Sequence, residues 1–283
     1  KELLDQIPQT AWDAFTVDNQ IYEIPSDANS IILHYNPKMY KEAGLAEPDE
    51  NYTWDQYVSD LQALTNGEGE NKVYGTMINP NFSWPWFYAN GVQLLNEDQT
   101  ASNLKDPKIK ETLQNLYDLI YKYEVAPVPQ TNDDLGNMFS AGRVATINMG
   151  MFMVATYEAN GFTDFDTAIV PRGADGGYGC FGIGGVGVTK SCEYPDAAYA
   201  LCKEFAAKEV SERQAKTGTS VPLRADEATS EDFLAHAPHI SRQYEEIENG
   251  KVLPAPENYS EMSTIIGSMV TNVLTNAMDI DTA

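Results

Sequence analysis

Apolar residues along this chain fall into two patterns, short β-branched runs and segments in which they recur every three or four residues. Runs of four to eight apolar residues bounded by turn residues are typical of buried strands. Strands are predicted on this basis at residues 30–35, 73–78, 144–148 and 168–171. The first twenty residues have no clear period, and we expect them to form a partly extended lead-in.

The second pattern predicts helices, each placed by its capping residues. The clearest helix begins at Asp106 and Pro107, an N-cap followed by a first-turn proline. Thr53 is the predicted N-cap of another helix, and further helices are expected at 38–43, from Pro195 and at about 260–277. Because strands and helices alternate, the fold class is predicted to be α/β, with a mostly parallel sheet flanked by helices.

Composition removes several classes of function. Of the 283 residues, 42 are acidic and 18 basic, which gives a formal net charge of -24. A nucleic-acid partner needs a basic face, so we predict none. No run approaches the roughly 18 to 20 apolar residues that span a bilayer, and the sequence predicts a soluble, acidic protein. No signal peptide is visible at the start, which is Lys1 rather than Met.

The three cysteines are too few for a disulfide scaffold and odd in number. Cys202 shares a predicted helix face with Ala198 and Phe205, where a small buried residue is expected. The sequence leaves open whether Cys180 and Cys192 pair.

Motifs for catalysis and cofactors are missing. Neither a nucleophile elbow nor a phosphate loop occurs, and the glycine run at 182–187 leads into a strand-like segment rather than a helix. Pro238 separates His236 from His239, so we expect a surface turn there rather than a zinc site. With 42 acids, carboxylate pairs arise by chance, and no glycosidase dyad can be identified. We predict no catalytic residues, metal or cofactor.

Aromatic and amide side chains are the strongest candidates for binding. Five aromatic residues lie within residues 82–88, directly after a predicted strand. Flat rings suit the C–H faces of sugars, and amides suit their hydroxyls. The candidates of this kind are Phe82, Trp84, Trp86, Phe152, Asn29, Asn79, Asn81 and Asn148. Trp84 and Trp86 have the alternative of filling the core, and for Trp84 that alternative is the stronger one.

Several blocks of sequence resemble the extracellular solute-binding proteins of ABC importers, in the order expected for that family. They are the stretch from Tyr22 to Leu45, which contains His34-Tyr35-Asn36-Pro37-Lys38, then Thr53-Trp54, Phe82-Ser83-Trp84-Pro85, Phe139-Ser140-Ala141-Gly142, the Gly184-Gly185 run and Pro195-Asp196-Ala197-Ala198. The third of these is similar to a block of the maltose-binding branch. Together they identify the chain as a carbohydrate-binding member of the family.

This resemblance implies a periplasmic-binding-protein-like, two-lobe α/β fold of type II. It covers about the last two-thirds of a typical member, so we expect the first lobe to be incomplete. The implied parts are a lead-in from the first lobe (1–20), the second lobe (21–181), a return segment of the first lobe (182–248) and C-terminal helices packing on the second lobe (249–283).

The resemblance also implies roles for individual residues. Asn29 matches a position where the maltose binder has a ligand-contacting acid, and Phe82 matches a ring of the sugar groove whose neighbouring tyrosine is replaced by Asn81. Phe152 aligns with a stacking tryptophan. Ser263 stands where another stacking tryptophan is found, and Tyr259 is its candidate substitute.

The implied function is a non-catalytic receptor that captures a sugar or oligosaccharide between two lobes for import. Its partners would be the membrane permease subunits, the protein would be a monomer, and it would be extracellular, either periplasmic or a cell-surface lipoprotein. Two alternatives stay open, a binding protein for another solute such as an oligopeptide or polyamine, and a glycoside hydrolase.

Overall fold

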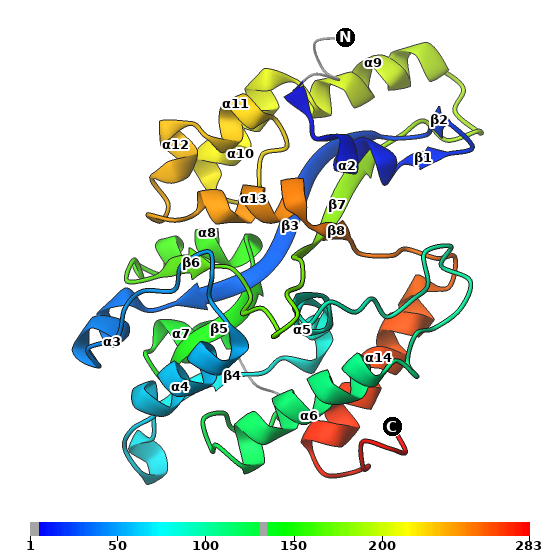
Figure 1. Cartoon of the computed structure of the whole chain (residues 1–283). Coiled ribbons are helices and arrows are strands. Elements are labelled where there is room, and N and C mark those ends of the chain that lie inside the picture. The colour runs from blue at the N-terminus through cyan, green and yellow to red at the C-terminus, as the bar shows by residue number, and fades with distance from the viewer. Residues whose placement is uncertain (1–5, 131–134) are drawn as a thin grey trace. The chain divides into compact units, whose positions relative to one another are not determined.

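The computed structural model describes residues 6–130 and 135–283, which form two compact units (Figure 1). Unit 1 contains the described residues up to Ile31, Gly150–Asn160 and Cys180–Leu253. Unit 2 contains the described residues of Ile32–Met149, Gly161–Gly179 and Pro254–Ala283. Strand β3 (Ile24–Tyr35) contributes its first residues to unit 1 and its last to unit 2. The domain limits inferred from the resemblance are a separate division of the chain and stay predictions.

Unit 2 is built on the end of β3 and three further strands. These are β4 (Tyr74–Met77), β5 (Val144–Gly150) and β6 (Asp166–Ala168). Strands β4 and β5 pair in parallel, whereas β6 pairs antiparallel with β3, with Leu33 opposite Ala168. The strands predicted at 30–35, 73–78 and 144–148 are therefore confirmed. The prediction at 168–171 was wrong beyond Ala168, because the chain leaves β3 there and Pro171 has no amide hydrogen to donate.

Helices surround this sheet within unit 2, and their limits follow the predicted caps. They are α3 (Pro37–Glu42), α4 (Trp54–Leu64), α5 (Trp84–Ala89), α6 (Pro107–Tyr121), α7 (Leu135–Ser140) and α14 (Tyr259–Leu274), with 3₁₀ turns η1 (Gly69–Asn71) and η2 (Pro80–Phe82). The Thr53 hydroxyl accepts from the Gln56 amide at 3.3 Å, and the Asp106 carboxylate accepts from the Lys108 amide at 2.9 Å. Both side chains satisfy amides that have no partner inside the helix.

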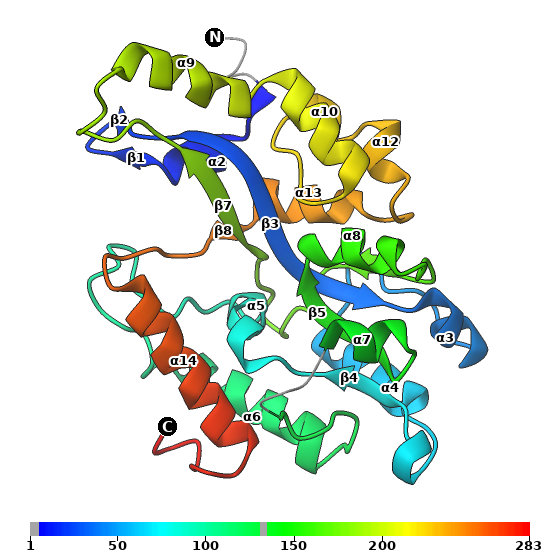
Figure 2. The same ribbon diagram turned by 180° about the vertical axis from the view of Figure 1, so that it is seen from behind.

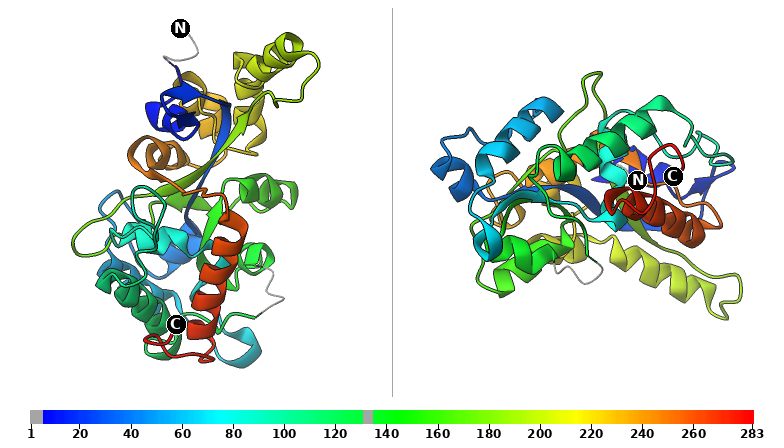
Figure 3. Two further views of the ribbon diagram at one scale, coloured as in Figure 1. Left: turned by 90° about the vertical axis from the view of Figure 1, so that its right-hand side faces the viewer. Right: turned by 90° about the horizontal axis from the view of Figure 1, so that it is seen from below.

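The core of unit 2 is rich in aromatic rings. Trp54, Tyr57 and Trp86 meet with ring centroids 5.6 to 5.8 Å apart. Helix α6 packs against α5 and α14, and the chain ends shortly after α14 (Figure 3). This core holds η2 and the start of α14 in fixed positions, because both are attached to buried helices.

Unit 1 contains short strands and most of the remaining helices (Figure 2). Its strands are β1 (Thr16–Val17), β2 (Gln20–Ile21), the first part of β3, β7 (Cys180–Val186) and β8 (Lys251–Val252). Its helices are α2 (Gln9–Asp13), α8 (Phe152–Ala159), α9 (Pro195–Phe205), α10 (Lys208–Thr217), α11 (Ala225–Ala228), α12 (Glu231–Leu234) and α13 (Ser241–Asn249). The expected partly extended lead-in contains the helix α2 as well as the strand β1. Residues 1–5 of that lead-in are outside the described residues.

Strand β7 runs antiparallel to β3, with Asn29 opposite Gly182 and Ser30 opposite Phe181. The prediction of a mostly parallel sheet was therefore wrong, and the sheet is mixed. The glycines of β7 permit close contact with β3, since a Cβ at Gly184 would overlap the Asp27 carboxylate. The glycine run at 182–187 thus serves close approach between two strands.

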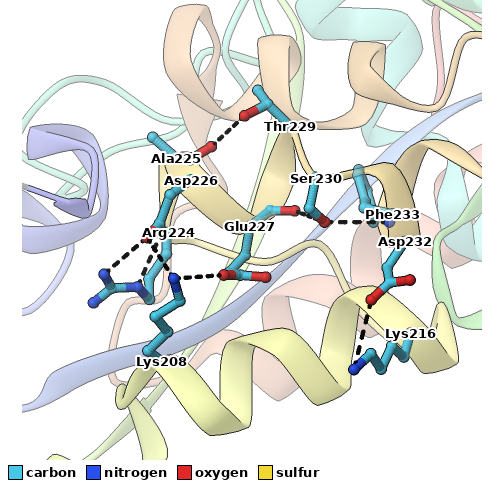
Figure 4. A network of polar contacts seen from close by, with 10 residues as sticks. All are labelled: Lys208, Lys216, Arg224, Ala225, Asp226, Glu227, Thr229, Ser230, Asp232 and Phe233. Atoms are coloured by element: carbon cyan, nitrogen blue, oxygen red, sulfur yellow. Dashed lines mark hydrogen bonds and ion pairs between the residues drawn. The ribbon is translucent and has the colours of Figure 1, made fainter.

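Ion pairs and hydrogen bonds join α10, α11 and α12 (Figure 4). Lys208 on α10 lies 3.8 Å from Asp226 and 3.6 Å from Glu227 on α11, and Arg224 contacts Asp226 through two nitrogens. The Arg224 guanidinium holds the pKa of the Asp226 carboxyl below its usual range. These contacts make the three helices one packed group within unit 1.

Two further sequence predictions have structural outcomes. The three cysteines are free thiols, so Cys180 and Cys192 do not pair, and Cys202 is buried as expected. Among the described residues, no helix is both long and apolar enough to cross a membrane.

Candidate functional site

Three of the predicted binding residues lie in unit 2 on one tight turn after strand β4. The side chain of Asn79 accepts a hydrogen bond from the Asn81 amide at 3.0 Å, and Pro80 begins η2. The Phe82 amide donates to the Asn79 carbonyl at 3.0 Å. These bonds fix the backbone of the turn, which leaves Asn81 exposed and Phe82 half-buried.

Helix α14 packs directly on this turn. A Cβ at Gly267 would lie 2.9 Å from the Asn81 Oδ1 atom, so the missing side chain allows the amide to approach the helix. Tyr259 is the first residue of the same helix and is 39% exposed, and Ser263 is half-buried. In unit 2, the amide of Asn81 and the ring of Phe82 lie on η2, and the ring of Tyr259 lies on α14, which contacts η2.

Trp84 differs from the three candidates on this turn. It begins α5 and is only 5% exposed, within a helix whose six residues are all buried. That position agrees with the core alternative, which the sequence analysis favoured for this residue.

The two candidates of unit 1 lie on β3 and α8. Phe152 is the first residue of α8 and is 41% exposed. Its ring lies over Gly150, where any Cβ would overlap the ring carbons. Asn29 lies in β3 next to Ala28, whose amide and carbonyl both bond Val221. The Asn29 Oδ1 atom is buried and has no hydrogen-bond partner in the described structure.

Asn148 is a further amide with unused bonding capacity. It is 5% exposed in β5, and neither its Oδ1 nor its Nδ2 atom has a hydrogen-bond partner among the described residues. Leaving a buried polar group unpaired costs about 1 to 3 kcal/mol, so such groups mark places that take up water or ligand. Asn29 and Asn148 both carry this signal, one in each unit.

Sequence reasoning missed a pocket of about 310 Å³ in unit 2. It lies between the first half of α14 and the segment around residues 94–104, and aliphatic side chains form most of its wall. The residues that line it include Leu94, Leu95, Leu104, Met262, Ile265 and Ile266. The apolar spacing of 262, 265 and 266 was the available signal, but that spacing is equally typical of a core-facing helix.

The prediction of a surface turn at His236 was wrong. The His236 side chain is 8% exposed, and its Nδ1 atom lies 2.7 Å from the Glu158 carboxylate. The turn faces inward because Glu158 and the Ala215 carbonyl, which lies 2.8 Å from Nε2, give the ring two polar partners.

Comparison with known proteins places the chain in a family. Residues 2–241 match the family model described as "Bacterial extracellular solute-binding protein". An arabinooligosaccharide-binding protein of Halalkalibacterium halodurans is 26% identical over 218 residues, a match that covers 72% of this chain and 47% of that protein. Putative binding proteins of Brucella abortus match over 42% of their length, so the chain spans less than half of these relatives.

Solved structures agree on the fold. An ABC substrate-binding protein of Listeria monocytogenes, solved in complex with cycloalternan, has a TM-score of 0.85 at 20% identity and is matched over 72% of its length by 98% of this chain. A solute-binding protein of Thermotoga lettingae bound with α-D-tagatose has a TM-score of 0.82 at 23% identity, with 99% of this chain and 74% of that one covered. The predicted fold class, that of the maltose-binding-protein-like α/β proteins, is confirmed by these likenesses. Because the family model matches most of its residues, the chain belongs to the bacterial extracellular solute-binding proteins.

Proposed function

We propose that this chain is part of the solute-capturing subunit of an ABC importer and that its solute is a sugar or oligosaccharide. The family match over residues 2–241 carries the proposal. Relatives named for arabinooligosaccharide and lactose binding, and structural neighbours solved with cyclic and linear sugars, support a carbohydrate as the solute.

The partly exposed rings and unpaired amides supply suitable chemistry. A ring such as Phe152 can lie against the apolar face of a sugar, while the free Oδ1 atom of Asn29 accepts from a hydroxyl. Asn81 and Tyr259 provide the same pair of functions in unit 2. Binding of this kind needs no bond to be broken, so the solute is released unchanged.

The whole protein acts outside the cytoplasmic membrane, as a periplasmic protein or a lipid-anchored one, and delivers the solute to the permease subunits as a monomer. Membership of the extracellular solute-binding family supports an extracellular localisation of the protein. The excess of 42 acidic over 18 basic residues favours a neutral solute over an anion.

Titration calorimetry against a panel of mono- and oligosaccharides tests this function. Phe152→Ala should weaken sugar binding by about 1 to 3 kcal/mol, as the loss of an aromatic anchor does. Phe205→Ala is the matched control, because Phe205 is also a partly exposed phenylalanine of unit 1 (46% exposed) and is not a predicted binding residue. Equal affinities for the wild type and the Phe152 variant would remove this ring from the site.

Two results would redirect the assignment. Binding of a peptide or a polyamine with no response to any sugar would change the solute class. Release of the chromophore from a chromogenic glycoside would favour the glycoside hydrolase, since a receptor returns its ligand intact.

A further inference from the structure

The ring of His236 lies between two hydrogen-bond acceptors inside unit 1. Its Nδ1 atom is 2.7 Å from Oε1 of Glu158 on α8, and its Nε2 atom is 2.8 Å from the carbonyl oxygen of Ala215 on α10. The side chain is 8% exposed, whereas that of Glu158 is 32% exposed. Water therefore competes for the carboxylate but has little access to the ring.

Counting donors gives the protonation state that fits this geometry. A carbonyl oxygen only accepts hydrogen bonds, and so does an ionised carboxylate. A neutral imidazole carries one N–H, so it would leave one nitrogen lone pair facing an oxygen lone pair at under 3 Å. A ring with protons on both nitrogens donates to both oxygens, and its charge strengthens the contact with Glu158.

The surroundings hold the ring in this place. Gly218 ends α10 with a φ of +58°, and a Cβ there would lie 2.9 Å from Cε1 of His236. Glu158 on α8 is the carboxylate that contacts the ring, whereas Asp232 on α12 pairs with Lys216 on α10 at 3.6 Å.

Helix α8 is short and buries little of its own surface, so this contact adds to its anchoring. It has eight residues, its N-cap Met151 makes no side-chain cap, and only Val154 and Tyr157 within it are buried. Phe152 begins this helix, so any shift of α8 moves the ring that we propose as a sugar platform. The bond from His236 to Glu158 ties the other half of α8 to α10.

We infer that His236 is a positioning residue, which as a double donor holds α8 against α10 and thereby sets the place of Phe152 for solute binding. This inference rests on the proposed function only in its last step, the effect on the solute. The number of protons on the ring tests it, because a ring with one N–H can donate to only one of the two oxygens.

Glu158→Gln separates positioning from simple packing. A glutamine can donate from its amide to Nδ1 while Nε2–H donates to Ala215, so a neutral ring then satisfies both partners. This variant should keep α8 in place with only one proton on the ring. His236→Gln can serve only one of the two oxygens and should release α8.

The test uses the full chain labelled in two ways. Long-range proton–nitrogen spectra of ¹⁵N-histidine, recorded near neutral pH, should show two protonated nitrogens on His236 in the wild type and one in Glu158→Gln. Fluorine spectra of fluorophenylalanine, with Phe152 assigned by Phe152→Leu, should give the same Phe152 signal in the wild type and Glu158→Gln and a shifted signal in His236→Gln. A single protonated nitrogen on His236 in the wild type, or an unshifted Phe152 signal in His236→Gln, would overturn the inference.

Calorimetry with maltotetraose and with the tightest sugar of the panel adds the functional step. Affinity should fall about tenfold with His236→Gln, the effect of one charge-assisted hydrogen bond, and should not change with Glu158→Gln. The two proposals fail separately. If no sugar binds while His236→Gln still shifts the Phe152 signal, the solute assignment is wrong and the role of His236 stands. If sugars bind but His236→Gln leaves the Phe152 signal unshifted, the solute assignment stands and the role of His236 is wrong.

Discussion

His34 makes the stability of unit 2 sensitive to acid, and the size of the effect can be worked from its burial. The ring is fully buried at the end of β3 and stacks on Phe165 with centroids 6.5 Å apart. Burial lowers the pKa of His34 from 6.5 to about 3, since the charged form would lose its hydration. At acid pH the unfolded chain therefore binds a proton that the folded chain does not.

The sign and the magnitude follow from this difference. A lowered folded-state pKa contributes stability above the unfolded value of 6.5, and that stability is lost as the pH falls towards about 3. Between pH 7 and pH 5 the loss from this one group should be about 2 kcal/mol, at up to about 1.4 kcal/mol per pH unit.

Urea unfolding followed by tryptophan fluorescence measures this loss. Trp54, Trp84 and Trp86 all lie in unit 2 with His34, and Trp12→Phe removes the signal from unit 1. His34→Gln in that background should lower the stability at pH 7 but lose about 2 kcal/mol less than its parent between pH 7 and pH 5.

Phe165→Leu is the matched control for packing. It removes the ring that stacks on His34 but keeps the titrating group, so it should lower the stability at both pH values and leave the acid slope unchanged. The protonation of surface carboxylates is common to all these proteins and cancels in the comparison. Equal acid slopes with and without His34, or ring protonation of His34 near pH 6.5 in proton spectra, would refute the reasoning.

Three further substitutions test the packing that holds the candidate site. Asp106→Ala removes the N-cap of α6 and should cost about 1 kcal/mol, measured as a lower urea midpoint, while Asp106→Asn should restore most of it. Trp86→Ala opens the ring cluster with Trp54 and Tyr57 and should cost about 3 to 5 kcal/mol in the same assay; a loss below 1 kcal/mol would contradict the cluster. Gly75→Ala should destabilise unit 2 by about 1 to 3 kcal/mol, since its Cβ would lie 2.6 Å from the Leu61 carbonyl, and unchanged thermal unfolding would show that this contact relaxes freely.

Local signals allowed much of the fold to be predicted. The caps at Thr53 and Asp106 depend on residues two or three positions away, and both form the expected bonds. The strands at 73–78 and 144–148 were equally visible, because their apolar runs end in turn residues. Information of this kind is contained in a short window of the chain, and no distant partner is needed to interpret it.

Pairings between distant segments could not be predicted in the same way. Strand β7 joins β3 across about 150 positions of sequence, and nothing in either strand shows that the pairing is antiparallel. His236 gives a second case, because its inward orientation depends on Glu158, which lies 78 positions earlier. The two-lobe fold was predicted from the resemblance to the solute-binding family, because local patterns do not show which distant segments pair.

Within the candidate site, the sequence identified suitable residue types but could not separate binding from packing. Phe82 and Trp84 are two positions apart in the same aromatic segment, yet the first is half-buried and the second is in the core. Burial of a large ring contributes about 1.5 to 3 kcal/mol, so a folding chain uses its rings for the core first. A ring that stays partly exposed does not pack fully in the core. Phe152 and Tyr259 are both partly exposed, and each is the first residue of a helix. Partial exposure of a ring is therefore a condition for its proposed role in binding and not evidence of that role, since Phe205 is 46% exposed and is not a predicted binding residue.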